Sequence, residues 1–170
     1  QSMLSAIVNC SVPTIAVVHG FCYGGGMGLI CSCDFILASS DSQFGFPEVR
    51  LGMIPAIISP YVNRKLDLSR MRELFITGEK FGLEKALGLG LLYESYEGDF
   101  SSPLQTLTSF ITKGGPRAQY KIKELLNGKI LSSKTRDADL AAFIDEIKRS
   151  SEGKEGISAF LEKRSPSWSD

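Results

Sequence analysis

Three consecutive glycines, Gly24–Gly26, are the residues of this chain best suited to bring main-chain groups close to a ligand. They follow an apolar run that ends at His19 and Gly20, and a second apolar run begins at Met27. Backbone N–H groups at a helix start lack partners within the helix and carry the positive end of its dipole. Without Cβ atoms, a carbonyl oxygen that develops negative charge can approach such groups closely. The same glycines also fit a tight turn packed against other backbone, and the residue types alone leave both interpretations open.

Other motifs that involve glycine or a nucleophile do not fit this stretch. No register of residues 20–28 gives the G-x-G-x-x-G of dinucleotide binding, and neither a P-loop nor a G-x-S-x-G elbow occurs. His19 is the only histidine, and we interpret it as a structural residue at a strand end rather than as part of a catalytic triad. Cys31 and Cys33 form a C-x-C without a second pair, so we expect no metal site and four reduced, buried thiols.

Alternating strand and helix patterns surround the glycines, and the end of the chain looks entirely helical. Proline and glycine punctuate the first part, which predicts an α/β class with a helical extension after about residue 100. Ser59 followed by Pro60 suggests an N-cap and a first helical position. The predicted strands are residues 12–20, 35–39 and 91–95, and the predicted helices are residues 4–8, 26–34, 69–78, 82–92, 102–115, 116–129, 135–150 and 156–164.

Composition excludes several classes of function. Nineteen basic residues balance nineteen acidic ones, so no net field favours nucleic acid or an anionic membrane. No apolar run reaches the ~18 residues that a membrane span needs. The first ten residues lack the features of a signal peptide, and we expect a cytoplasmic protein.

Three collinear stretches resemble the crotonase (enoyl-CoA hydratase/isomerase) superfamily. They are "PTIAVVHGFCYGGGMGLICSCDFILASSDSQFGFPEVRLGMIP", "FITGEKFGLEKALGLGLL" and "EGISAFLEKRSPSW". The resemblance implies a ββα spiral core over residues 1–100, incomplete at its N-terminus, and a helical oligomerisation region over residues 101–170. It also implies a homotrimer or a hexamer, an acyl-CoA substrate and no cofactor beyond the CoA of that substrate.

The same resemblance assigns roles to individual residues. The N–H of Gly25 would be one oxyanion-hole donor, with Gly24 and Gly26 shaping the turn. Glu48, in "FGFPEV", matches a catalytic glutamate of the family. Gly28 stands where many hydratases carry a first glutamate, and we expect it to leave room for a branched or charged acyl group.

Two interpretations of the activity follow from the missing glutamate. Moving a double bond needs one proton taken and returned, so Glu48 alone would suit an isomerase or a decarboxylase. "LGMIPAIISPYV" instead resembles the branch of methylglutaconyl-CoA and carboxygeranoyl-CoA hydratases, which favours a lyase of fatty-acid or branched-chain amino-acid catabolism. A CoA-binding protein without catalysis is a third hypothesis, since one scaffold hosts many chemistries.

Two residues near the end of the chain resemble CoA contacts. Phe160 and Lys163, in "AFLEKR", match positions that contact the adenine and a phosphate of CoA. Lysine offers a point charge that suits a phosphate. A core aromatic residue and a solvated lysine are the alternative interpretation of the same two residues.

Overall fold

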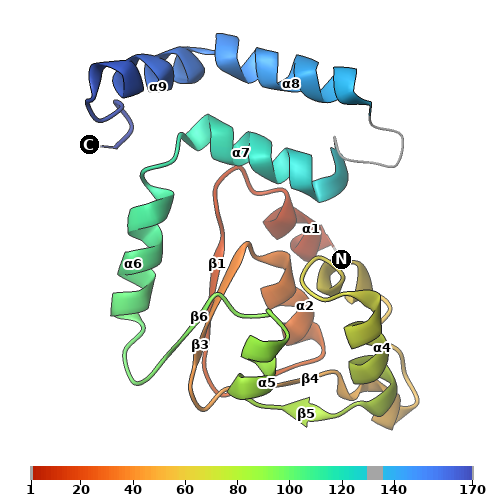
Figure 1. Cartoon of the computed structure of the whole chain (residues 1–170). Coiled ribbons are helices and arrows are strands. Elements are labelled where there is room, and N and C mark those ends of the chain that lie inside the picture. The colour runs from red at the N-terminus through yellow and green to blue at the C-terminus, as the bar shows by residue number, and fades with distance from the viewer. Residues whose placement is uncertain (1, 130–135, 170) are drawn as a thin grey trace. The chain divides into compact units, whose positions relative to one another are not determined.

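The computed structural model describes residues 2–129 and 136–169, which form two compact units (Figure 1). Unit 1 comprises Gln1–Cys10 and Thr14–Gln105, and unit 2 comprises Ser11–Pro13 and Thr106–Asp170. None of the helices among the described residues combines the length and apolarity that crossing a bilayer requires.

One parallel sheet of unit 1 has the strand order β1-β3-β6. Its strands are β1 (Ile15–Val18), β3 (Phe35–Ser39) and β6 (Glu94–Tyr96). The register pairs Ile15 with Phe35 and Leu37 with Glu94. The prediction of a strand at residues 35–39 is confirmed. β1 is shorter than the predicted strand at residues 12–20, and β6 is shifted from the predicted residues 91–95, because it begins at Glu94 and ends at Tyr96.

A second sheet of unit 1 has the order β2-β4-β5. Its strands are β2 (Phe21–Tyr23), β4 (Gln43–Gly45) and β5 (Lys80–Phe81). β2 and β4 run parallel, with Tyr23 opposite Gly45, whereas β4 and β5 run antiparallel. Parallel pairing brings the ends of β2 and β4 to the same edge of this sheet, and the segments that follow both strands start there.

Helices pack against these sheets in unit 1. They are α1 (Ser2–Val8), α2 (Gly25–Ser32), the 3₁₀ helix η1 (Pro47–Leu51), α3 (Ser59–Val62), α4 (Leu68–Thr77) and α5 (Leu83–Gly88). Gly78 ends α4 in the left-handed region, as its sequence predicts. The prediction of an N-cap at Ser59 is wrong: Ile58 is the N-cap, and the Ser59 hydroxyl donates to the carbonyl oxygen of Ala56.

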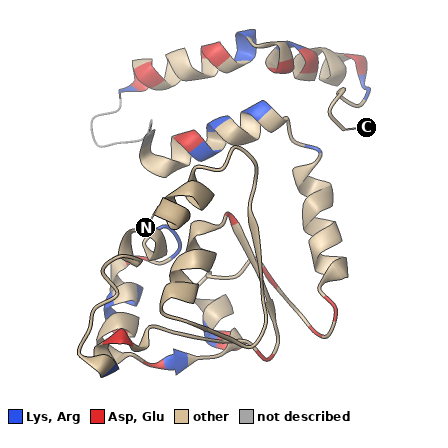
Figure 2. Cartoon of the chain, turned by 180° about the vertical axis from the view of Figure 1, so that it is seen from behind, with Lys and Arg blue, Asp and Glu red and all other residues tan. Residues whose placement is uncertain are grey.

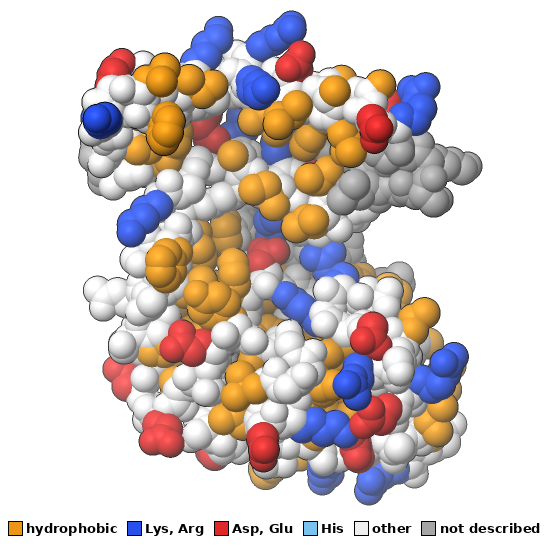
Figure 3. Space-filling model, in the orientation of Figure 1, with side chains coloured by type: hydrophobic (Ala, Val, Ile, Leu, Met, Phe, Trp, Pro, Cys, Tyr) orange, Lys and Arg blue, Asp and Glu red, His pale blue; other side chains and the backbone are white. Residues whose placement is uncertain are grey.

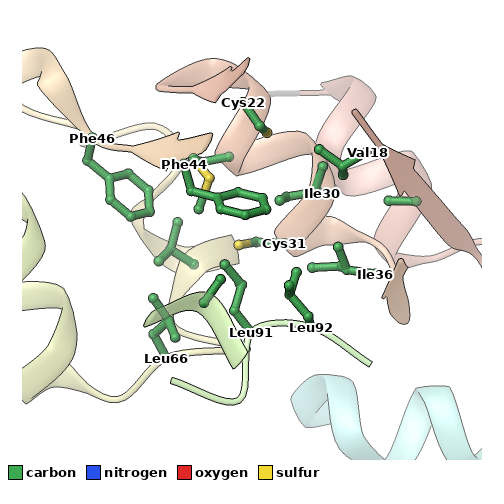
Figure 4. Packing of buried hydrophobic residues seen from close by; sticks show 14 of the residues in the cluster. Val18, Cys22, Ile30, Cys31, Ile36, Phe44, Phe46, Leu66, Leu91 and Leu92 are labelled. Atoms are coloured by element: carbon green, nitrogen blue, oxygen red, sulfur yellow. The ribbon is translucent and has the colours of Figure 1, made fainter. Parts of the chain in front are cut away.

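Buried phenylalanines anchor the second sheet in the core of unit 1, which is otherwise mostly aliphatic. Phe44 and Phe46 are fully buried, and Phe44 belongs to the same cluster as Ile30 and Cys31 of α2 (Figure 4). The rings of Phe46 and Phe75 lie 4.7 Å apart in an edge-to-face arrangement. Burying a phenylalanine side chain stabilises a fold by about 1.5–3 kcal/mol, so these residues hold β4 firmly against the helices.

The four cysteines are free thiols, and three of them are buried. Burial raises the pKa of Cys22 to about 11 and that of Cys31 to about 12 from an ordinary value of 9.0. The thiolate is the reactive form of cysteine, and a raised pKa makes it scarcer at neutral pH. We therefore expect a thiol-specific disulfide reagent to modify half-buried Cys10 at least ~100-fold faster than Cys22 or Cys31. Mass spectrometry of the labelled native chain measures this, with Cys10→Ser as the control. Rapid labelling of Cys31 in the native chain would contradict it.

Unit 2 is helical. Its helices are α6 (Ser101–Ile111), which begins in unit 1, α7 (Pro116–Glu124), the π-helical turn η2 (Leu125–Lys129), α8 (Asp137–Arg149) and α9 (Ser151–Glu162). The last helix, α9, contacts both α7 and α8. The Glu152 carboxylate of α9 accepts hydrogen bonds from the N–H groups of Arg117 and Ala118 at the start of α7. This contact satisfies two otherwise unpaired N–H groups of α7. Basic and acidic residues both occur on α7, α8 and α9 (Figure 2).

An ion pair ties the C-terminal residues of unit 2 to α9. Glu155 accepts hydrogen bonds from Arg164 at 2.6 Å and from the N–H of Ser167 at 3.0 Å. The Arg164 guanidinium, followed by the Ser167 N–H, lowers the pKa of Glu155 from its ordinary 4.5 to about 2. Trp168, which follows directly, donates to the carbonyl oxygen of Lys113.

This ion pair predicts an acid-induced release of Trp168, the only tryptophan of the chain. A carboxyl whose folded pKa is lowered stabilises the fold above its unfolded pKa and loses that effect as the pH falls through the folded value. The tail should therefore detach progressively between about pH 4.5 and pH 2, and Trp168 fluorescence reports it. In Glu155→Gln the tail should already be loose at neutral pH. An unchanged spectrum in that variant would argue against the account.

Candidate active site

The glycine turn, Gly24–Gly26, joins the end of β2 to the start of α2. Gly24 is the N-cap of α2 and has φ 52° and ψ −115°, a conformation that residues with a Cβ rarely adopt. Its N–H donates to the carbonyl oxygen of Gly45 at the end of β4, at 3.1 Å. The predicted turn into a helix is confirmed here, but the strand that enters it is β2, which lies beyond the predicted strand at residues 12–20. The positive φ explains why the turn needs a glycine at position 24.

Glu48 reaches the glycine turn from the segment that follows β4, the strand paired with β2. It lies in η1, directly after β4, and its backbone carbonyl oxygen accepts a hydrogen bond from Met53. A Cβ built on Gly24 would lie 3.2 Å from Glu48 Oε1. Because β2 and β4 are parallel neighbours, the segments after them place the predicted turn and the predicted acid side by side.

One carboxylate oxygen of Glu48 has no partner. Oε2 is buried and accepts no hydrogen bond from any residue that the structure describes. Leaving a buried acceptor unsatisfied costs about 1–3 kcal/mol, and such groups in native structures call for a specific explanation. A ligand proton beside Glu48 would supply the missing partner.

The main chain at the start of α2 is open to a ligand. Gly25 is exposed, and a Cβ placed there would meet no atom within 4 Å. Gly26 is also exposed, and its missing Cβ faces the Cys22 thiol at 3.3 Å. The first N–H groups of a helix have no partner within it and carry the positive end of its dipole. The site therefore combines exposed backbone at the start of α2 with a carboxylate whose buried Oε2 has no hydrogen-bond partner among the described residues.

The structure corrects the expectation for Gly28. This residue is buried one turn into α2, where its N–H donates to the carbonyl oxygen of Gly24 at 3.2 Å. A Cβ at position 28 would lie 2.3 Å from Ile58 Cγ2 and 3.6 Å from Leu4 Cδ1. The space beside Gly28 is thus filled by Ile58, and it is not left free for an acyl group. No sequence pattern points to Ile58, because the contact joins two helices.

Phe160 and Lys163 lie at the end of α9 in unit 2. Phe160 is 81% exposed, so it is not a core residue of that unit. Lys163 is also exposed and is the C-cap of α9, with a left-handed φ of 55°. Both side chains are therefore accessible on unit 2. Hydrophobic side chains also reach the surface of the helices of unit 2 (Figure 3). They belong to a different unit from Glu48 and the glycine turn.

His19 and other polar groups outside the turn have different surroundings. His19 is exposed at the end of β1, and Asp34 accepts hydrogen bonds from the N–H and hydroxyl of Thr14. Within residues 2–129 and 136–169, no three His, Cys, Asp or Glu side chains gather as metal ligands would. A cavity of about 230 Å³ that the sequence did not suggest is lined by Lys65 and Tyr93, among other residues. Glu48 and the glycine turn are not among its lining residues.

Comparison with known proteins agrees with this arrangement. A profile of the enoyl-CoA hydratase/isomerase family matches residues 1–170. A probable enoyl-CoA hydratase of Bacillus subtilis is 31% identical over 99% of this chain and 67% of its own length. An enoyl-CoA isomerase/hydratase of Mycosarcoma maydis is 32% identical over 98% of this chain and 62% of its own length. This chain belongs to the enoyl-CoA hydratase/isomerase family, as its sequence motifs predict.

Solved structures show the same fold. An enoyl-CoA hydratase of Shewanella pealeana superposes with a TM-score of 0.88 at 34% identity, over 98% of this chain and 63% of that one. AtuE of Pseudomonas aeruginosa superposes with a TM-score of 0.90 at 33% identity, over 99% of this chain and 67% of that one. The predicted crotonase-type α/β fold is confirmed. The chain spans about two thirds of the length of these relatives.

Proposed function

We propose that this chain carries the catalytic glutamate and one oxyanion-hole donor of an enoyl-CoA hydratase-like enzyme. The observation that carries the proposal is the Glu48 carboxylate, which lies against Gly24 with its buried Oε2 unpaired. A catalytic acid or base must lie beside the atom whose proton it exchanges. The N–H of Gly25, at the start of the adjacent helix α2, would bind the thioester carbonyl oxygen next to Glu48. Membership of the family supports an acyl-CoA substrate.

The reaction would use both groups in one step. Negative charge develops on the carbonyl oxygen of the thioester when a proton is removed beside it or when hydroxide adds to the β-carbon, and the charge is lost when the α-carbon gains a proton. The N–H of Gly25 and the positive end of α2 stabilise that charge. In hydration, Glu48 takes a proton from water, the hydroxyl group adds to the β-carbon, and Glu48 returns a proton to the α-carbon.

Enoyl-CoA isomerisation is the second candidate, and one observation favours it. The position on α2 that could hold a second carboxylate is Gly28, and Ile58 fills the space beside it. Isomerisation needs a single group that removes a proton at one carbon and returns it at another. Glu48 alone suffices for that reaction.

We also propose roles for the residues of unit 2. The exposed ring of Phe160 would stack on the adenine of CoA, and Lys163 would pair with a CoA phosphate. The apolar surface of unit 2, which includes Ile144 and Ile157, would be covered in a homotrimer or hexamer. The proposed enzyme acts in the cytoplasm and needs no cofactor besides the CoA of its substrate.

The test follows the enoyl-thioester absorbance of crotonyl-CoA and 3-methylglutaconyl-CoA in the presence of the complete gene product. The products are then identified by NMR. Formation of a 3-hydroxyacyl-CoA would support the hydratase, and a shifted double bond would support the isomerase. The protein could instead bind a saturated acyl-CoA and turn over neither these substrates nor their 3-enoyl isomers. That result would overturn the hydratase and the isomerase proposals and leave a non-catalytic CoA-binding protein.

A further inference from the structure

We propose that Lys65 is a modification site, where an amine at the wall of a cavity takes the acyl group of a short-chain acyl thioester and forms an amide. Lys65 follows α3 in unit 1. The cavity that it lines does not include Glu48 or the glycine turn. The reaction uses neither of these groups, so the inference goes beyond the proposed function and does not depend on it.

The cavity gives a small acyl group access to the Lys65 side chain. Its volume of about 230 Å³ is several times the ~30 Å³ share of one water molecule. The wall runs from the core to the surface, because Ile36 and Leu91 are buried whereas Tyr93 is 45% exposed (Figure 4). The hydrocarbon and aromatic side chains that line it are Phe35, Ile36, Leu91, Leu92 and Tyr93.

The amine of Lys65 has a main-chain partner and no counter-charge beside it. Its Nζ donates a hydrogen bond to the carbonyl oxygen of Asp34 at 2.6 Å. The carboxylate of Asp34 instead accepts hydrogen bonds from the N–H and the hydroxyl of Thr14. No carboxylate among the described residues forms an ion pair with Lys65. The charged form of this amine therefore gains little from its surroundings.

The surroundings instead favour the neutral amine. Burial lowers the pKa of Lys65 from its ordinary 10.5, and the charge of Arg64 acts in the same direction. Asp34, Cys31 and Cys33 oppose this shift of the Lys65 pKa. Cys31 is however an uncharged thiol at neutral pH, because burial raises its pKa to about 12. Lys65 therefore holds a larger neutral fraction at neutral pH than an ordinary lysine does.

The proposed reaction is a direct acyl transfer. The lone pair of the neutral Lys65 Nζ attacks the carbonyl carbon of the thioester, and the C–S bond breaks. The nitrogen loses one proton to solvent, and the thiol leaves as a thiolate that takes up a proton. The products are an amide on Nζ and free CoA. Acyl-CoA thioesters, the substrate class that membership of the family supports, are the donors.

Lys85 is a matched comparison within the same unit. It is half-buried like Lys65, but it forms ion pairs with Glu73, at 2.6 Å, and with Glu79. The hydrogen bond to Glu73, followed by that to Glu79, raises the pKa of Lys85 above its ordinary 10.5. The two lysines thus have similar burial and opposite shifts of pKa, and Lys85 should resist acylation.

The test incubates the complete gene product with butyryl-CoA at pH 7.5 and follows each lysine by peptide mass spectrometry. We expect Lys65 to be butyrylated at least ~10-fold faster than Lys85, because two amines whose pKa values differ by one already differ ~10-fold in neutral fraction below both values. Lys65 should also react no more slowly than exposed Lys154, since the cavity admits the acyl group. Lys65→Arg keeps the charge and should remove only the signal of position 65.

The pH dependence separates amine chemistry from accessibility. The preference for Lys65 over Lys85 should shrink as the pH rises to 10, because Lys85 then loses its proton as well. A preference that stays constant with pH would overturn the inference. Equal rates at Lys65 and Lys85 at pH 7.5, or faster labelling of Lys154 than of Lys65, would also overturn it.

The variant Glu48→Gln keeps this inference and the proposed function apart. It should lose turnover of enoyl-CoA and keep the parental rate of butyrylation at Lys65. Loss of butyrylation in Glu48→Gln would mean that the acyl group passes through the candidate active site, which would overturn direct attack by Lys65. Unchanged turnover with normal butyrylation would instead overturn the proposed function and support the modification site.

Discussion

Glu48→Gln is expected to lower turnover of an enoyl-CoA substrate by about 10²- to 10⁴-fold, because the amide cannot exchange the proton that the reaction needs. The fold should tolerate the change. Glutamine has the same size, and Oε2 of Glu48 makes no hydrogen bond to any described residue that the substitution could remove. Steady-state kinetics and thermal melting of the purified variant measure the two effects separately.

Glu84→Gln is the matched control for this variant. Glu84 is an exposed acid on α5 of the same unit, and its neutralisation should leave turnover within a factor of two of the parent. If Glu48→Gln kept more than half of the parental turnover while folding normally, Glu48 would not be the acid–base group.

Gly24→Ala is expected to produce the second large effect, on stability and activity together. A residue with a Cβ is strained at φ 52° and ψ −115°, which costs about 1–3 kcal/mol. The new Cβ would also lie 3.2 Å from Glu48 Oε1 and push the carboxylate away from the turn. We expect turnover to fall at least ~100-fold, since small displacements of a catalytic group have effects of that size.

Gly98→Ala separates the two causes. Gly98 also has a left-handed φ, of 67°, but a Cβ there would meet no atom within 4 Å. The Gly98→Ala variant should therefore be less stable, because of backbone strain, and should keep the parental turnover. A similar loss of turnover in both variants would mean that Gly24 acts through general destabilisation and not through its contact with Glu48.

The local signals of the sequence predicted the framework of the site. Gly24–Gly26 between two apolar runs predicted a turn from a strand into a helix, and Gly78 predicted the end of α4. These features depend on the backbone freedom of glycine, which acts within a few residues. The resemblance to the family then singled out Glu48, and the structure places it beside Gly24.

Features that depend on contacts between distant residues could not be predicted in this way. The strands β2, β4 and β5 have two or three residues each, which is too few for a periodic sequence pattern. Their extended conformation is stabilised by pairing within one sheet. Gly28 was misinterpreted because Ile58, which fills its space, comes from another helix. Ser59 looked like an N-cap, but the helix begins with Ile58 at that position. In each case tertiary packing, rather than local preference, decides the structure.

Exchange of α-protons with solvent tests the central claim most directly, because it requires enolate formation but neither hydration nor isomerisation. The complete gene product is incubated with butyryl-CoA, a saturated thioester, in D₂O, and proton NMR follows the α-methylene signal. The account predicts loss of that signal with the parent protein, and none above background with Glu48→Gln or Gly24→Ala. Equal exchange in the parent and in Glu48→Gln would contradict the assignment of Glu48 and the glycine turn as the enolate-forming site.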